Sequence, residues 1–204
     1  MEFGKAWKRI GISTSVLLLL LLAGIIVIYW KSSTTVVLVV RHAERNDPAP
    51  GCAASATCPL PNGNPANPPI SAVGQTRRDE LAHVVEDTGI QAIYASCFCR
   101  TQQTVETTAT NRGLTTIIVP QQAADGSVDI ADLIAQINNN NTGQKVLVAG
   151  HTSTVPAIID ALGGGGIDPI AENEFDNLYV VTIVRWWWVG KRVRVVRLKY
   201  GAAT

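Results

Sequence analysis

The sequence predicts an α/β fold of three layers, in which helices flank a mostly parallel central sheet. In residues 32–204, short runs rich in β-branched residues alternate with helix-forming stretches, the order typical of parallel sheets. The run at 34–40, TTVVLVV, shows no alternation of polar and apolar residues, which indicates a strand buried on both faces. With 47% hydrophobic and 16% charged residues, the 204-residue chain suits one domain with a real core and is too short for two enzymatic domains.

A long loop, two helices and a strand are expected after the strand at 34–40. Residues 44–70 are rich in Pro, Gly and Asn, which favours a loop. Residues 71–88 contain helix-forming and apolar residues, and Gly89 is placed to end a helix. The apolar segment 91–95 predicts a short strand, and the Thr-rich segment 101–111 predicts a weaker helix.

The second half repeats the alternation and ends in a hairpin. Residues 114–119 predict a strand that Pro120 stops, and residues 130–138 predict a helix before a run of asparagines. The segment 144–149, QKVLVA, predicts a strand, and a helix over 156–162 ends in four glycines. Residues 178–185 and 192–200 then predict two strands joined around Gly190.

Residues 1–31 are expected to form a unit separate from the domain at 32–204. Residues 10–30 carry no charge, and a helix of that length spans roughly 30 Å, the thickness of a hydrocarbon core. The sequence thus predicts one transmembrane helix at 10–30, with a cleaved signal peptide as the alternative. Basic residues before this stretch outnumber the single Lys31 after it, which predicts a cytoplasmic N-terminus. The domain is therefore expected to be membrane-anchored and extracytoplasmic or periplasmic.

The charge distribution argues against a nucleic-acid partner. The chain has 17 basic and 16 acidic residues, but their distribution is uneven. The bases gather near the two ends of the chain, and the middle, 32–184, is acidic overall. A protein that binds the phosphate backbone needs a basic stripe over its working surface. Any anion site in the acidic middle must therefore be local.

The four cysteines predict one disulfide and no metal site. Cys52 and Cys58 lie in the loop at 44–70. Because a loop of this composition would be poorly ordered without a covalent cross-link, a disulfide between the two is expected. Cys97 and Cys99 are two residues apart, too close to bridge each other easily, and are expected to be free thiols or packing residues. The cysteine and histidine spacings match no zinc motif. No metal or cofactor is expected.

Charged and polar residues follow three of the predicted strands. Arg41, His42 and Glu44 follow the first strand, and Arg100 follows the second. His151 follows the fourth strand, with Thr152 and Ser153 beside it. Ligands of open α/β sheets bind beyond the carboxyl ends of the strands. These residues are therefore expected to converge on one site.

The residue types at these positions suit the chemistry of a phosphoryl group. Two arginines can cradle phosphate oxygens, because the guanidinium fork matches them. A neutral, oriented histidine can act as a covalent nucleophile, and a second histidine can stabilise charge on the phosphoryl oxygens. Such a site can transfer a phosphoryl group by positioning and charge neutralisation without a metal.

Three segments resemble the motifs of the histidine phosphatase superfamily, the phosphoglycerate mutase-like proteins. The segment 39–44, VVRHAE, resembles the RHG/RHA signature, and 96–104, SCFCRTQQT, resembles the S-x-x-x-R-x-x-x-T motif. The segment 149–153, AGHTS, is similar to the GHS/GHT motif. All three occur in family order, and the resemblance covers about 35–200. It implies a compact, membrane-anchored, bacterial-type member of the superfamily.

The resemblance also implies a role for each site residue. His42 would be the nucleophile that forms a phosphohistidine, while Arg41, Arg100 and His151 would bind the phosphoryl group, with Thr152 beside them. Glu44 is the favoured general acid because it lies two residues after His42. Asp125 or Asp129 are the next candidates, and Glu106 and Asp132 lie in the same stretch of chain.

The implied function is metal-independent hydrolysis of phosphomonoesters, or related phosphoryl compounds, through that phosphohistidine. The partners would be a small phosphorylated substrate or a phosphoprotein, together with the membrane through residues 10–30. Two alternatives stay open on the same fold: a non-catalytic module that binds phosphorylated ligands, and a phosphomutase. Turnover of an aryl phosphate that is lost in His42→Ala would separate the enzyme from the binding module.

Overall fold

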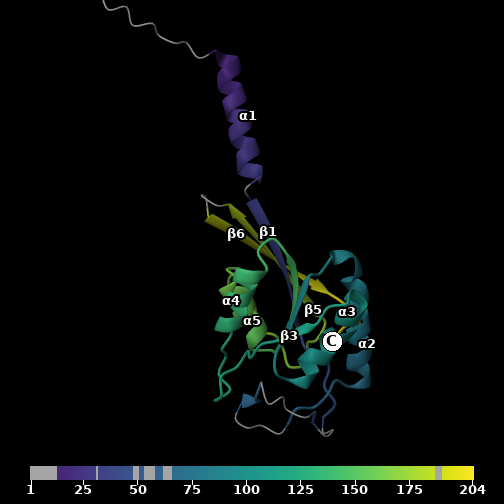
Figure 1. Cartoon of the computed structure of the whole chain (residues 1–204). Coiled ribbons are helices and arrows are strands. Elements are labelled where there is room, and N and C mark those ends of the chain that lie inside the picture. Colours follow the sequence, from purple (N-terminus) through teal and green to yellow (C-terminus); the bar gives the residue numbers. More distant parts are fainter. Residues whose placement is uncertain (1–12, 31, 48–50, 53–57, 62–65, 187–189) are drawn as a thin grey trace, which may run out of the picture.

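The computed structural model describes residues 13–30, 32–47, 51–52, 58–61, 66–186 and 190–204. Its strands are β1 (Ser32–Arg41), β2 (Ala92–Ala95), β3 (Thr116–Ile118), β4 (Lys145–Gly150), β5 (Asn177–Trp186) and β6 (Gly190–Lys199). Its helices are α1 (Thr14–Trp30), α2 (Ala72–Val84), the short 3-10 helix η2 (Glu86–Thr88), α3 (Cys99–Arg112), α4 (Ala131–Asn140) and α5 (Thr154–Ala161). The α/β class predicted from the sequence is confirmed (Figure 1).

The strands form one mixed sheet in the order β3-β2-β4-β1-β5-β6. Neighbours among β3, β2, β4 and β1 pair in parallel, but β5 runs antiparallel to β1 and β6 antiparallel to β5. The expectation of a mostly parallel sheet is therefore corrected. The reason is that the closing hairpin joins the sheet beside β1 in the opposite direction, as antiparallel neighbours can.

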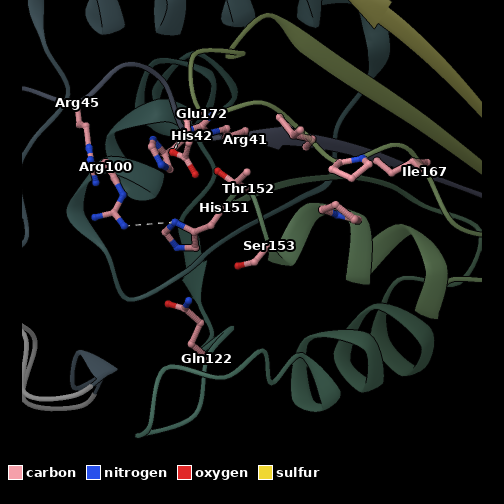
Figure 2. Close-up of a pocket in the computed structure, with 13 residues that line it drawn as sticks. Arg41, His42, Arg45, Arg100, Gln122, His151, Thr152, Ser153, Ile167 and Glu172 are labelled. Carbon is pink, nitrogen blue, oxygen red and sulfur yellow. Dashed lines mark hydrogen bonds and ion pairs between the residues drawn. The ribbon is translucent and has the colours of Figure 1, made fainter.

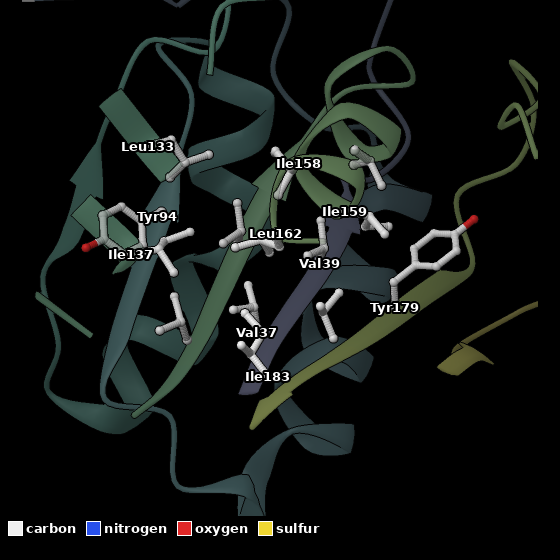
Figure 3. Close-up of a cluster of buried hydrophobic side chains, with 14 of the residues drawn as sticks. Val37, Val39, Tyr94, Leu133, Ile137, Ile158, Ile159, Leu162, Tyr179 and Ile183 are labelled. Atoms are coloured by element: carbon white, nitrogen blue, oxygen red, sulfur yellow. The ribbon is translucent and has the colours of Figure 1, made fainter. Parts of the chain in front are cut away.

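Helices cover both faces of the sheet and bury a separate core on each. α4 and α5 lie on one face, and α2 and α3 lie on the other (Figure 1). Side chains of β1 alternate between the cores: Val37 and Val39 pack with α4 and α5 (Figure 3), whereas Leu38 and Val40 pack with α2 and α3. This double burial explains why the first strand shows no alternation in its sequence.

The predicted transmembrane anchor is corrected by the structure. In the described part of the chain, no helix combines the length and the apolar character needed to cross a membrane. The apolar helix α1 has 17 residues, which corresponds to roughly 26 Å and is shorter than a hydrocarbon core of about 30 Å. Residues 10–12 of the expected segment lie outside the described residues. The expected membrane-bound, extracytoplasmic location is wrong on this finding.

The cysteine pairing also differs from the expectation. Cys52 bonds to Cys99 and Cys58 to Cys97, so the predicted Cys52–Cys58 bridge is wrong and Cys97 and Cys99 are not free. The side chain of Asn67 reinforces this connection: its Oδ1 accepts from the Cys99 backbone N at 2.8 Å, and its Nδ2 donates to the Cys52 carbonyl at 3.3 Å. The loop after β1 is thereby tied to the start of α3.

Mapping the disulfides tests this pairing. Proteolysis without reduction is expected to give peptides that join Cys52 to Cys99 and Cys58 to Cys97, with no Cys52–Cys58 peptide. Each bridge closes a segment of about 40 residues or more, so its loss is expected to lower the free energy of unfolding by about 3 to 4 kcal/mol. The double variant Cys58→Ser with Cys97→Ser, measured by thermal unfolding, checks this loss while one bridge remains. An unchanged Tm would contradict the expected contribution.

Candidate active site

The ends of β1, β2 and β4 meet at one pocket. Its volume is about 490 Å³, which lies within the range of small-molecule sites. The structure brings Arg41, His42, Arg100 and His151 together in its lining, with Thr152 beside them (Figure 2). The ring centroids of the two histidines are 5.4 Å apart. The four side chains that the sequence predicted to converge therefore line one pocket.

His42 is held in the tautomer that a nucleophile needs. Its backbone N donates to the Gly150 carbonyl at 2.9 Å, which fixes the residue beside β4. Its ring Nδ1 lies 2.8 Å from the Ala43 carbonyl. Since a carbonyl can only accept, Nδ1 carries the proton and Nε2 keeps a free electron pair. Burial and then the charge of Arg100 lower the pKa of His42 to about 3, so the ring stays neutral well below neutral pH.

His151 is oriented by groups on both sides of its ring. Nε2 lies 2.8 Å from the Ser96 hydroxyl, and Nδ1 lies 3.5 Å from Nη2 of Arg100. A guanidinium can only donate, so Nδ1 is the acceptor and Nε2 donates to Ser96. Burial, then the neighbouring His42 and the arginines, lowers the pKa of His151. The second histidine is therefore also held neutral in the free protein.

The two motif arginines are buried and keep unpaired donors. Arg41 and Arg100 are 4% and 9% exposed. Their guanidinium groups stack at 4.1 Å on the rings of Phe175 and Phe98, respectively. Among the described residues, the Nε atoms of both are buried without a hydrogen-bond partner. An unsatisfied buried donor on a cation is costly, and an anion bound between the two arginines would relieve that cost.

Local contacts explain why the second motif contains Thr104 and why the third contains Gly150. The Thr104 hydroxyl donates to the Arg100 carbonyl at 2.6 Å and accepts from the Ala43 backbone N at 2.8 Å, which joins α3 to the loop after β1. Gly150 precedes His151, and a Cβ there would lie only 2.7 Å from Oγ1 of Thr154. That hydroxyl accepts from the His151 backbone N at 2.8 Å. Glycine thus permits the close turn that presents His151.

The structure does not bring Glu44 into this pocket. Its carboxylate accepts hydrogen bonds from Nε and Nη2 of Arg77 at 2.7 to 2.9 Å. Arg77 in turn donates to the carbonyls of Tyr200 and Ala202, so the ion pair ties the chain after β1 to α2 and to the end of the chain. The arrangement indicates a structural role for Glu44 and does not favour the expected role of proton donor.

The other carboxylates expected as acids also lie outside the pocket lining. Asp125 is exposed and accepts from the backbone N and the hydroxyl of Ser127. Asp129 is exposed and accepts from the backbone N of Ala131, where α4 begins. Glu106 pairs with Arg78 on the surface, and Asp132 is an exposed residue of the first turn of α4. Each has a local structural contact or an exposed position instead.

Sequence reasoning missed two charged residues that line the pocket, Glu172 and Arg45. The Glu172 carboxylate lies 3.5 Å from Nη2 of Arg41, and the turn that carries it is fixed because Nη1 of Arg41 donates to the carbonyls of Ala171 and Glu174. Glu172 comes 21 residues after His151 in no recognisable motif, so no sequence signal identified it. Arg45 lies three residues after His42, a closeness that could have indicated it.

A family model described as "Histidine phosphatase superfamily (branch 1)" matches residues 37–122. The matched segment contains Arg41, His42 and Arg100. No curated protein matches the chain.

Several solved structures share the fold. The protein histidine phosphatase SixA complexed with tungstate is 18% identical, with a TM-score of 0.54 over 80% of this chain and 96% of that chain. A mycobacterial glucosyl-3-phosphoglycerate phosphatase in complex with VO3 is 13% identical, with a TM-score of 0.56 over 81% and 99%. A putative α-ribazole-5′-P phosphatase from Escherichia coli is 14% identical, with a TM-score of 0.54 over 83% and 99%.

At these identities the likenesses concern the fold, and the family match adds the first two motifs. The third motif, which contains His151, lies outside the residues of the family match. Its histidine nevertheless lines the same pocket as Arg41, His42 and Arg100. Together these findings show that the chain shares the fold of solved histidine phosphatases and resembles the histidine phosphatase superfamily over residues 37–122.

Proposed function

We propose that this protein is a phosphatase that hydrolyses phosphoryl compounds through a phosphohistidine at His42. The proposal rests on one observation: a histidine that can act as a nucleophile lies in the same pocket as the side chains that would bind the phosphoryl oxygens. His42 presents a neutral Nε2 in the pocket, because Nδ1 is bound to the Ala43 carbonyl. Arg41, Arg100 and His151 line the same pocket around it. The family match and the phosphatases that share the fold support the same activity.

The arrangement supports a reaction in two steps. Nε2 of His42 attacks the phosphorus, and the bond to the leaving oxygen breaks, with its electron pair and a proton going to the leaving group. Arg41 and Arg100 neutralise the charge on the remaining oxygens, and His151 contributes a further polar contact. Water then attacks the phosphohistidine, which releases inorganic phosphate and restores His42.

The substrate class is proposed as a small phosphorylated compound or a phosphoprotein. The proteins with the same fold include one named as a protein histidine phosphatase and one named for glucosyl-3-phosphoglycerate, a protein and a small molecule. The pocket lining here combines charged residues with an apolar wall formed by Pro156, Ile167, Pro169 and Ile170. A leaving group with an apolar part would fit beside the phosphoryl site.

Trapping the intermediate tests the proposed mechanism. Mixing the full chain with a substrate labelled in its phosphoryl group, followed by an alkaline quench within milliseconds, is expected to leave label on the protein. The label should map to the peptide that contains His42 and should disappear on acid treatment, as phosphoramidates do. Turnover without any labelled protein at short times would contradict the covalent route.

We further propose that Glu172 donates the proton to the leaving group. It is the carboxylate in the described pocket lining, and its side chain is 88% exposed, so it reaches the mouth of the pocket. A bound phosphoryl dianion would compete with the Glu172 carboxylate for Nη2 of Arg41. A positioned carboxylic acid in that place can then protonate a departing alkoxide.

Substrates that differ in their leaving group test this role. Glu172→Gln is expected to lower kcat for an alkyl phosphate by about 100-fold, because general acid catalysis typically contributes that much or more. Turnover of 4-nitrophenyl phosphate should change by less than about threefold, since nitrophenolate leaves without a proton. Glu86→Gln, which changes an exposed carboxylate outside the pocket lining, is the control. An equal loss on both substrates would contradict the role.

A further inference from the structure

Arg45 is a third arginine in the pocket lining and belongs to none of the three motifs. Its side chain is 50% exposed, whereas Arg41 and Arg100 are almost fully buried. Figure 2 shows its guanidinium beside that of Arg100. Arg45 contributes the largest effect of any charge on the pKa of Arg100, second only to burial, and it lowers that pKa. The charge of Arg45 therefore acts on the pocket, and its half-exposed side chain lies at the pocket mouth.

The backbone that carries Arg45 is fixed. Arg45 forms an antiparallel bridge with Ile70. On either side of it, the Asn46 N donates to the Pro69 carbonyl at 2.8 Å, and the Ser71 N donates to the Glu44 carbonyl at 2.7 Å. Three consecutive residues after the nucleophile are thus paired with the chain that leads into α2. A guanidinium on a fixed backbone loses less conformational entropy when it binds a ligand.

The present partner of Arg45 can be exchanged at little cost. Nε of Arg45 lies 2.6 Å from the Asp47 carboxylate, and the two side chains are 50% and 52% exposed. Exposed ion pairs typically contribute less than about 1 kcal/mol. An anionic group of a ligand could therefore replace Asp47 on this guanidinium.

The direction of phosphoryl transfer determines which part of the substrate would carry the anionic group that binds Arg45. The attacking and leaving atoms lie roughly in line through the phosphorus. Since His42 is 4% exposed in the floor of the pocket, the leaving group must point toward the mouth. On this geometry the buried Arg41 and Arg100 would hold the transferred phosphoryl group, and the half-exposed Arg45 would lie beside the leaving part of the substrate.

We propose that Arg45 binds a second anionic group, a carboxylate or a further phosphate, on the leaving part of the substrate. This inference rests on the proposed function of the same pocket and narrows its substrate class to phosphoryl compounds with two anionic groups. Arg45 is thus a specificity-determining residue. The guanidinium suits this task because its fork binds carboxylate and phosphate oxygens in pairs.

Binding of phosphonates that cannot be hydrolysed tests the proposal. The full chain is titrated by calorimetry with phenylphosphonate and with its 3-carboxy and 4-carboxy derivatives. The wild type is expected to bind the better carboxy isomer about tenfold more tightly than phenylphosphonate, as a charge-assisted hydrogen bond at a partly exposed site allows. In Arg45→Gln this preference should fall to about one, with the affinity for phenylphosphonate changed by less than about threefold.

Two further variants sharpen the experiment. Arg194→Gln removes the same charge from the exposed strand β6 and is expected to keep the preference. Asp47→Asn removes the competing carboxylate and is expected to raise the preference. Equal weakening of all three phosphonates in Arg45→Gln would show that Arg45 holds the phosphoryl group itself, and this would overturn the proposal. A wild type that prefers neither carboxy isomer would overturn it as well.

The outcome is separable from that of the phosphatase proposal. Phosphonate binding needs no turnover, so the preference can be measured even in a protein that hydrolyses nothing. Hydrolysis of aryl phosphates without a preference for the carboxy phosphonates would contradict only the role of Arg45. A preference without hydrolysis would contradict only the phosphatase, and a wild type that binds no phosphonate would contradict the anion site on which both depend.

Discussion

His42→Ala is expected to abolish hydrolysis of 4-nitrophenyl phosphate, with a loss in kcat of at least about 10⁴-fold and no phosphohistidine. The change removes the nucleophile, so the covalent route is closed. The surrounding groups remain: Arg41 keeps its bonds to the carbonyls of Ala171 and Glu174, and Arg100 keeps its stacking on Phe98. Vanadate or phosphate should therefore still bind. Steady-state turnover and alkaline-quench labelling provide the two measurements.

His83→Ala is the matched control for this experiment. His83 lies on α2 with its side chain 83% exposed, and it contacts Glu86 on the surface. The same substitution there removes an imidazole without touching the pocket, so kcat should change by less than about twofold. If His42→Ala kept kcat within about tenfold of His83→Ala prepared and assayed identically, the nucleophile assignment would be contradicted.

The convergence of the four motif residues could be predicted because it depends on local features. Each motif directly follows a strand whose sequence is apolar and clear, and parallel strands bring their carboxyl ends to one edge of a sheet. Arg41 ends β1, Arg100 lies in the first turn of α3 after β2, and His151 follows β4. No exact strand order was needed for this prediction.

The position of the Glu44 carboxylate and the pairing of the cysteines could not be predicted because both depend on long-range placement. Glu44 is two residues from His42, but closeness in sequence does not fix the direction of a side chain, and the buried Arg77 binds it. Cys52 meets Cys99 across 47 residues, since the loop returns along Asn67 to the start of α3. The mixed sheet has the same cause, because the direction of β5 relative to β1 follows from packing.

Glu44→Gln separates the structural role of this residue from the catalytic role that its sequence position implied. The Glu44 carboxylate is 17% exposed and Arg77 only 2%, so the substitution leaves a buried guanidinium without its counter-charge. Removal of one partner of a buried pair costs about 3 to 5 kcal/mol. Glutamine retains an acceptor oxygen, so a loss of about 2 to 3 kcal/mol in the free energy of unfolding is expected here.

Urea unfolding and turnover should therefore respond differently to this change. The midpoint of unfolding is expected to fall in Glu44→Gln, while kcat at a temperature where the variant is folded stays within about threefold of the wild type. Glu106→Gln, at an exposed carboxylate that contacts Arg78, should alter neither quantity. A fall of about 100-fold in kcat with unchanged stability would instead identify Glu44 as the proton donor. The pairing with Arg77 predicts the opposite pattern because the two oxygens that would hold the proton already accept from a buried cation.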